Sequence, residues 1–144
     1  MVEQDTIKLL RECDAGVKMG ISSIGDVLNY VSSHGLKKVL QDSSQEHDGL
    51  KADLQGLLGE YHDEGKEPAA MAKGMSWVKT NVKLTMNESD STVADLITDG
   101  CNMGVKSLSR YLNKYQAADE RSKDIAKRII SAEDRLCTDV RAYL

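Results

Sequence analysis

The chain has 144 residues and a formal net charge of −4, and 40% of its residues are hydrophobic while 29% are charged. This balance excludes a disordered chain, and the length suffices for one domain whose core needs neither metals nor disulfides. No apolar run approaches the roughly 20 residues of a membrane span, and the N-terminus lacks the features of a signal peptide, so we expect a cytoplasmic protein without a membrane partner.

The first predicted element is a helix over about residues 3–32. Its apolar positions recur at alternating spacings of three and four residues, which place them on one helical face. This face comprises Ile7, Leu10, Val17, Ile21, Ile24, Leu28 and Val31, and Asp14 is its polar member. Gly35 follows closely and suits a left-handed C-terminal cap. The short connection predicts that the next helix runs back antiparallel to the first.

The second predicted helix repeats this spacing, and Ser43 and His47 are the polar members of its buried face. Its apolar positions are Leu36, Leu40, Leu50, Leu54, Leu57 and Tyr61. A polar stretch over residues 62–67 ends the helix, and Pro68 cannot continue it. Residues 3–64 are therefore predicted to form one helical hairpin.

A shorter amphipathic helix is predicted over residues 68–87. Its apolar face comprises Met71, Met75, Val78, Val82 and Met86. A helix of about 18 residues can carry the chain from one end of a bundle to the other. We therefore expect this segment to be a crossover helix.

The last predicted element is a second hairpin over residues 90–143. Ser89 and its neighbours supply an N-terminal cap for its first helix, and Asp119 can cap its second. The hairpin looks like a copy of the first one. Asp14, Gly16, Val17 and Lys18 correspond to Asn102, Gly104, Val105 and Lys106, and Asp48, Leu50 and Asp53 correspond to Asp134, Leu136 and Asp139.

The three cysteines are odd in number and far apart, which favours buried, reduced thiols over a zinc site or a redox pair. They are Cys13, Cys101 and Cys137. The chain has no basic stripe with interleaved aromatic residues, so no nucleic-acid partner is expected.

Two duplicated antiparallel hairpins joined by a short crossover helix make an all-α fold that resembles the ferritin-like superfamily. The resemblance is closest to its uncharacterised bacterial four-helix-bundle proteins with a degenerate metal site. Active di-iron members place a glutamate on the first helix of each hairpin and a Glu-x-x-His pair on the second. In this chain the resemblance implies a reduced metal set of Asp14, His47 and Glu133, because Ser44 and Ile130 occupy the two glutamate positions.

Asp14 and His47 also admit a purely structural interpretation. Each interrupts an apolar face, and the two helices lie next to each other in the predicted hairpin. The preferred interpretation is that they form a buried hydrogen-bonded pair that fixes the helix register, rather than a metal site.

The favoured functional hypothesis is a non-catalytic helical bundle that acts as a bacterial interaction or stress-related module. Its partner would be an unidentified protein or, through helical surfaces, further copies of the same chain. The alternative is a protein that binds a small ligand, iron or another divalent metal at the reduced site of Asp14, His47 and Glu133.

Overall fold

The computed structural model describes residues 2–68 and 89–144, and this part of the chain folds into four long helices without a strand. They are α1 (Val2–Leu28), α2 (His34–Glu60), α5 (Asp90–Lys114) and α6 (Glu120–Val140), followed by a 3-10 turn over Arg141–Tyr143. The predicted all-α class is confirmed. The crossover helix predicted at 68–87 lies, except for Pro68, outside the described residues. None of the described helices is long and apolar enough to cross a membrane.

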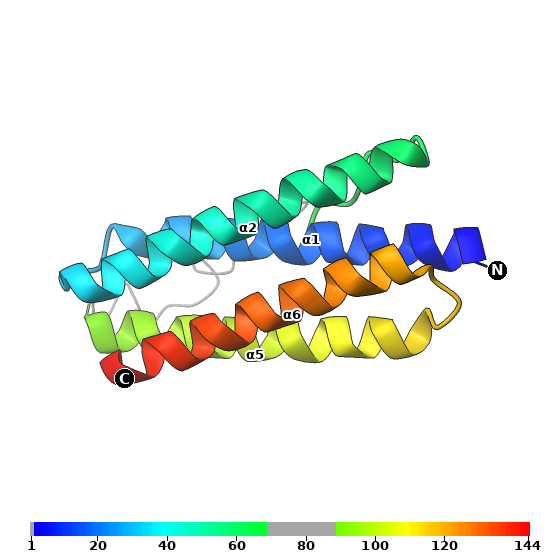
Figure 1. Ribbon diagram of the computed structural model, residues 1–144. Helices are drawn as coiled ribbons and strands as arrows, with labels where there is room; N and C mark the ends of the chain where they lie inside the picture. Colours follow the sequence, from blue (N-terminus) through cyan, green and yellow to red (C-terminus); the bar gives the residue numbers. More distant parts are fainter. Residues whose placement is uncertain (1, 69–88) are drawn as a thin grey trace.

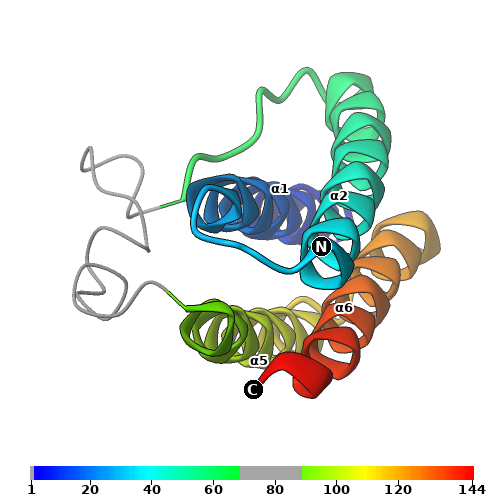
Figure 2. The same cartoon turned by 90° about the vertical axis from the view of Figure 1, so that its left-hand side faces the viewer.

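The four helices lie side by side as two antiparallel pairs (Figure 1). α1 packs against α2 and α5, and α6 packs against α5 and α2. Seen along the bundle, α1 and α5 lie on one side and α2 and α6 on the other (Figure 2). The end of α2 and the start of α5 lie at opposite ends of the bundle (Figure 1).

Apolar side chains fill the bundle as two clusters, one toward each end. The N-terminal cluster contains Leu9, Leu10, Cys13, Val17, Leu50, Leu54, Leu58, Leu108, Ala118, Ile125, Ala126, Ile129 and Ala132. The C-terminal cluster contains Ile24, Val27, Leu36, Leu40, Val93, Ala94, Leu96, Ile97, Cys101, Leu136, Cys137 and Val140. Both clusters draw side chains from all four helices.

The first helix ends at Leu28, four residues before its predicted end near residue 32. The cause is a contact with the other hairpin, because the carboxylate of Asp90 accepts the backbone N–H groups of Ser32 (2.8 Å) and Ser33 (3.0 Å). These bonds hold the turn in an extended form that a continuing helix could not adopt. The start of α5 thus ties down the turn between α1 and α2.

The prediction that Gly35 caps the first helix was wrong, because Gly35 lies in the first turn of α2. Ser33 is the N-cap of α2, and its hydroxyl accepts the N–H of Leu36. The hydroxyl of Tyr143 occupies the space beside Gly35, so a Cβ atom at this position would require the end of the Tyr143 side chain to shift.

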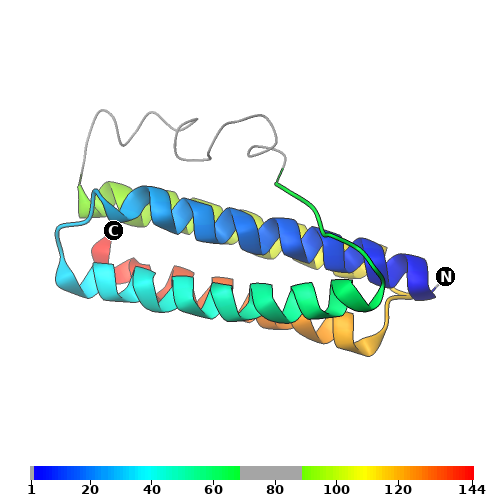
Figure 3. The ribbon, with the colours of Figure 1, turned by 90° about the horizontal axis from the view of Figure 1, so that it is seen from above.

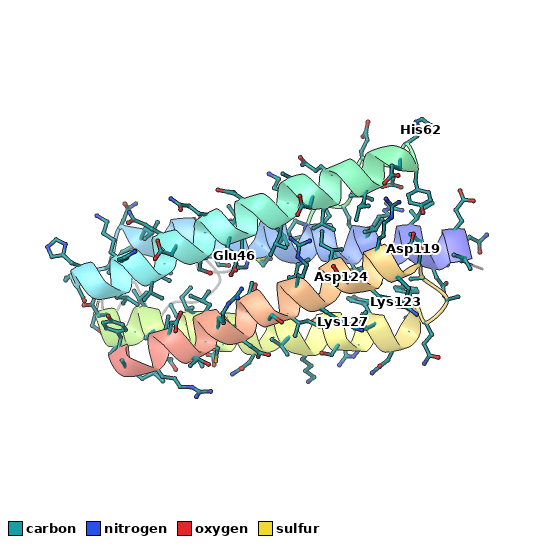
Figure 4. The ribbon with its side chains drawn as sticks, viewed as in Figure 1. Glu46, His62, Asp119, Lys123, Asp124 and Lys127 are labelled. Atoms are coloured by element: carbon teal, nitrogen blue, oxygen red, sulfur yellow. The ribbon has the colours of Figure 1, made fainter. Side chains whose placement is uncertain are left out.

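α2 ends in a Schellman-type cap. His62, seen just beyond α2 in Figure 4, has a left-handed φ of 54°. Its N–H donates to the carbonyl of Gly59 (3.1 Å), and the N–H of Asp63 donates to the carbonyl of Leu58 (3.0 Å). This cap turns the chain back, and residues 63–68 then leave α2 on the side of α1 (Figure 3).

Three ion pairs link α2 to α6 at successive heptads. They join Glu60 to Arg121, Asp53 to Arg128 and Glu46 to Arg135. Figure 4 shows Glu46 on the side of α2 that faces α6. All six side chains are largely exposed, so solvent screening leaves each pair only a small contribution to stability. Their regular spacing nevertheless marks a single register between the two helices.

The three cysteines are free and buried, as the sequence predicts. Burial, with smaller effects of Glu12 and Asp14, raises the pKa of the Cys13 thiol to about 12. A thiol with so high a pKa stays protonated at neutral pH and is a poor nucleophile.

Candidate functional site

A buried polar pair lies between the two apolar clusters. His47 of α2 is 0% exposed and Glu133 of α6 is 6% exposed. The imidazole Nε2 lies 2.7 Å from the carboxylate Oε1 of Glu133. The register marked by the ion pairs between α2 and α6 brings these two side chains together. We call them the His47–Glu133 pair.

The orientation of the His47 ring is fixed by its own helix. Nδ1 lies 2.8 Å from the backbone carbonyl oxygen of Ser43 and 3.4 Å from the Ser43 hydroxyl. Burial lowers the pKa of His47, but the hydrogen bond and charge of Glu133 raise it, as do the Ser43 carbonyl and Glu46, and the net shift is upward. The pair therefore favours a protonated ring next to a carboxylate.

Gly20 of α1 makes room for this ring. A Cβ atom at position 20 would lie 2.8 Å from Cδ2 and 2.9 Å from Nε2 of His47, and 3.3 Å from Oε1 of Glu133. Three helices thus meet at the pair, and α1 contributes only backbone.

The predicted contact between Asp14 and His47 was wrong. Position 20, not position 14, faces the His47 ring, and six residues of helix separate the two positions by about 9 Å. The structure brings His47 and Glu133 together but places Asp14 elsewhere. The antiparallel register of α2 on α1 is responsible, because it sets Asp14 nearer to the end of the hairpin where α2 stops.

Asp14 anchors the segment that follows α2. Its Oδ2 accepts the backbone N–H of Lys66 (3.0 Å) and pairs with Nζ of Lys18 (2.8 Å). Lys18 also reaches Glu67 (2.9 Å). Gly65 has a φ of 90°, and a Cβ atom there would lie 2.2 Å from Oδ2 of Asp14. The buried aspartate is thus part of a docking site for residues 65–67 on α1.

The proposed metal set of Asp14, His47 and Glu133 is not assembled as a single cluster. Among the residues that the structure describes, no three His, Cys, Asp or Glu side chains gather closely enough to hold a metal ion. Both ring nitrogens of His47 are engaged in hydrogen bonds to protein groups. A metal could bind His47 only by displacing one of these bonds.

We expect the protein, purified without added metal, to contain well under one iron per chain and to show no ferroxidase activity. The reason is that Ser44 and Ile130 replace the bridging carboxylates that iron requires, and that His47 is already paired. Elemental analysis of the purified protein measures the iron. Near-stoichiometric iron that disappears in a His47→Ala variant would contradict this expectation.

A groove between α1 and α5 opens above the His47–Glu133 pair. Its cavity volume is about 230 Å³. Most of its lining is apolar or small, and Glu133 lies at its floor. The lining residues are Glu12, Ala15, Gly16, Met19, Gly20, Ser23, Ile24, Ile97, Gly100, Cys101, Met103, Gly104, Ser107, Leu108, Tyr111, Ile129, Glu133 and Leu136. We call it the α1/α5 groove.

Reasoning from sequence missed this groove and the role of Gly20. A signal was present, because α1 carries Gly16 and Gly20 four residues apart and α5 carries Gly100 and Gly104 with the same spacing. Residues four apart share a helical face. Two such faces opposite one another leave space where larger side chains would meet.

No protein-family model matches the sequence, and no curated protein matches it either. Among solved structures, the crystal structure of a conserved hypothetical protein from Mycobacterium tuberculosis is similar over 100% of both chains, with a TM-score of 0.74 and 16% sequence identity. At this identity the similarity shows that the two chains share a fold.

Proposed function

We propose that the chain is a ferritin-like bundle of two duplicated hairpins, with residues 68–87 as a crossover helix. Three observations support this. α2 ends and α5 begins at opposite ends of the bundle, and residues 65–67 dock beside Asp14 and Lys18 on α1 (Figures 1 and 3). His47 and Glu133 also occupy equivalent positions in the sequence repeat and contact each other. Equivalent residues of two related units meet in this way close to a two-fold axis.

We further propose that this bundle is non-catalytic and works by binding a small molecule in the α1/α5 groove. The observation that supports this function is the groove itself, which has apolar walls and one buried carboxylate at its floor. Concave apolar sites with a few placed polar groups are typical of small-molecule binding.

Two glycines in the groove support the same function. Gly16 and Gly104 each cost a helix about 1 kcal/mol relative to alanine. A Cβ atom at Gly104 would come no closer than 3.6 Å to Glu133, and one at Gly16 would lie 4.0 Å from Leu108. Packing among the described residues therefore does not require glycine at either position. Their effect is to keep the groove open at the expense of stability.

Binding of toluene tests this function. We expect saturable NMR chemical-shift changes at the amides of Gly16, Ile24 and Gly104 in the intact chain, and their loss in a Gly104→Leu variant, whose side chain would fill the groove. Gly56→Leu is the matched control, because Gly56 is an exposed helical glycine on α2 with nothing within 4 Å of its Cβ position. Shift changes that persist in Gly104→Leu, or none in the intact chain, would refute the proposal.

A further inference from the structure

The described chain on either side of residues 69–88 ends beside the two walls of the α1/α5 groove. On the incoming side, Nζ of Lys66 lies 2.5 Å from Oε1 of Glu12, and Glu12 is a lining residue of the groove. Lys18 of α1 holds Glu67 in the same way (2.9 Å). The chain therefore leaves the described part at the rim that α1 contributes to the groove.

On the outgoing side, α5 itself forms the opposite wall. It begins at Asp90, whose carboxylate accepts two backbone N–H groups of the turn that follows α1. Between Glu12 and the end of α1 at Leu28, the helix rises about 24 Å, and a helix of about 18 residues is about 27 Å long. Residues 69–88 therefore suffice to follow the groove as a helix, in agreement with the proposed crossover.

The apolar face expected for this segment matches the groove in chemistry and size. It comprises Met71, Met75, Val78, Val82 and Met86. A cavity of about 150 Å³ holds benzene, so by proportion the groove volume of about 230 Å³ accommodates roughly two to three aliphatic side chains. Methionine is suited to this task, because its unbranched side chain fills irregular gaps.

The walls of the groove leave room for such a face. Packing among the described residues does not require glycine at position 16 or 104, so the space beside both glycines is available to side chains from a neighbouring helix. Met19 and Met103 line the same groove, and Met103 is 47% exposed. Covering these side chains favours docking, because it removes apolar surface from water.

We propose that residues 71–86 dock their apolar face into the α1/α5 groove of the same chain and compete there with the small molecule. The docked segment runs parallel to α1 and antiparallel to α5, as the places where the chain leaves and returns require. This inference rests on the proposed crossover helix and binding function. It adds a competitor, built into the chain, that sets the apparent affinity for the ligand.

Methionine methyl groups test the docking directly, because they lie on both partners. Met71, Met75 and Met86 belong to the segment, whereas Met19 and Met103 line the groove. In the intact chain with isotope-labelled methionine methyl groups, we expect nuclear Overhauser cross peaks between the two sets. Their absence would overturn the proposal. Cross peaks found only between labelled and unlabelled chains of a mixed sample would place a second copy in the groove and overturn it equally.

Two substitutions in the segment separate its faces. Val78→Asp places a charge on the docking face, and since an uncompensated charge in an apolar site is costly, the segment should be released and the cross peaks lost. Thr80→Asp is the matched control, because position 80 lies on the opposite side of a helix, and it should keep the cross peaks. Circular dichroism checks that both variants remain helical. Cross peaks that survive in Val78→Asp would overturn the assignment of this face.

Toluene titration measures the competition. Because a minor state is typically populated to about 0.1–10%, release of the segment in Val78→Asp should raise the apparent affinity for toluene at least about tenfold. Thr80→Asp should bind toluene like the wild type. Equal affinities in all three proteins would overturn the competition.

The two measurements fail independently. If toluene shifts the groove amides in none of the three proteins, the proposed binding function fails, and the cross peaks still decide whether the segment docks. If toluene binds but the cross peaks are missing, the docking is refuted and the binding function stands.

Discussion

Replacing Glu133 by alanine is expected to lower the free energy of unfolding by about 3–5 kcal/mol, because it leaves the buried His47 ring without its partner. His47→Ala should have a similar cost, since it leaves the carboxylate buried and unpaired. Asp14→Ala combined with His47→Ala is a useful control. As the two residues do not touch, their effects should add to within about 0.5 kcal/mol, whereas His47 and Glu133 should be strongly coupled.

A Glu133→Gln variant separates the charge of the pair from its hydrogen bond. The glutamine amide can donate a hydrogen bond to Nε2 of a neutral His47, while Nδ1–H of the ring continues to donate to the Ser43 carbonyl oxygen. The variant should therefore fold and be less destabilised than Glu133→Ala. It should, however, lose the carboxylate that raises the pKa of His47, so that burial then lowers this pKa.

The two proteins should consequently differ in pH dependence. In the wild type the pKa of folded His47 lies above the unfolded value of about 6.5, so its stabilisation is complete below about pH 6.5 and is lost as pH rises through the folded pKa. In Glu133→Gln the folded pKa lies below the unfolded one, so stability is instead lost as pH falls. Urea unfolding over a pH series measures both slopes. Parallel slopes for the two proteins would show that His47 is not charged in the folded wild type.

Alanine substitutions at Gly20 and Gly104 are expected to have opposite effects. Gly20→Ala should lower the free energy of unfolding by about 1–3 kcal/mol, since the new Cβ atom would lie 2.8 Å from a buried ring held by hydrogen bonds at both nitrogens. Gly104→Ala should raise it by up to about 1 kcal/mol, because its Cβ atom makes only ordinary contacts and the helix gains from alanine.

Thermal or urea unfolding of the two variants measures this difference directly. Gly56→Ala reports the helix-propensity gain alone, because nothing lies within 4 Å of its Cβ position. A Gly20→Ala variant as stable as Gly56→Ala would mean that the ring of His47 can move away from α1 at no cost. The close approach of α1 to the His47–Glu133 pair would then be incidental.

The sequence predicts the helices well but not the contacts between them. Apolar periodicity depends on each helix alone, and so do the caps at Ser89 and Asp119, which the structure confirms. The end of the first helix was misplaced because it depends on Asp90, 58 residues away from Ser32 in the chain. Local sequence carries no information about such a contact.

The candidate site was predicted only in part for a related reason. The polar position of His47 within an apolar face marks it as a core position, and the structure buries it. Glu133 was identified only through the resemblance to the ferritin-like superfamily, and the structure buries it as well. Their partners depend on helix register, and a shift by one turn keeps the same apolar face buried. The sequence therefore predicted the wrong partner for His47, which meets Glu133 instead of Asp14. The α1/α5 groove depends on the approach of two helices from different hairpins.

The polar layer formed by the His47–Glu133 pair gives the bundle a lengthwise division. The apolar clusters on its two sides each combine residues of α1, α2, α5 and α6. Neither hairpin contains a complete apolar core by itself. The hairpins therefore cannot fold independently, even if they arose by duplication. The natural cooperative units are instead the two ends of the bundle. Partial unfolding should fray all four helices together from one end as far as this layer, and leave the other end intact.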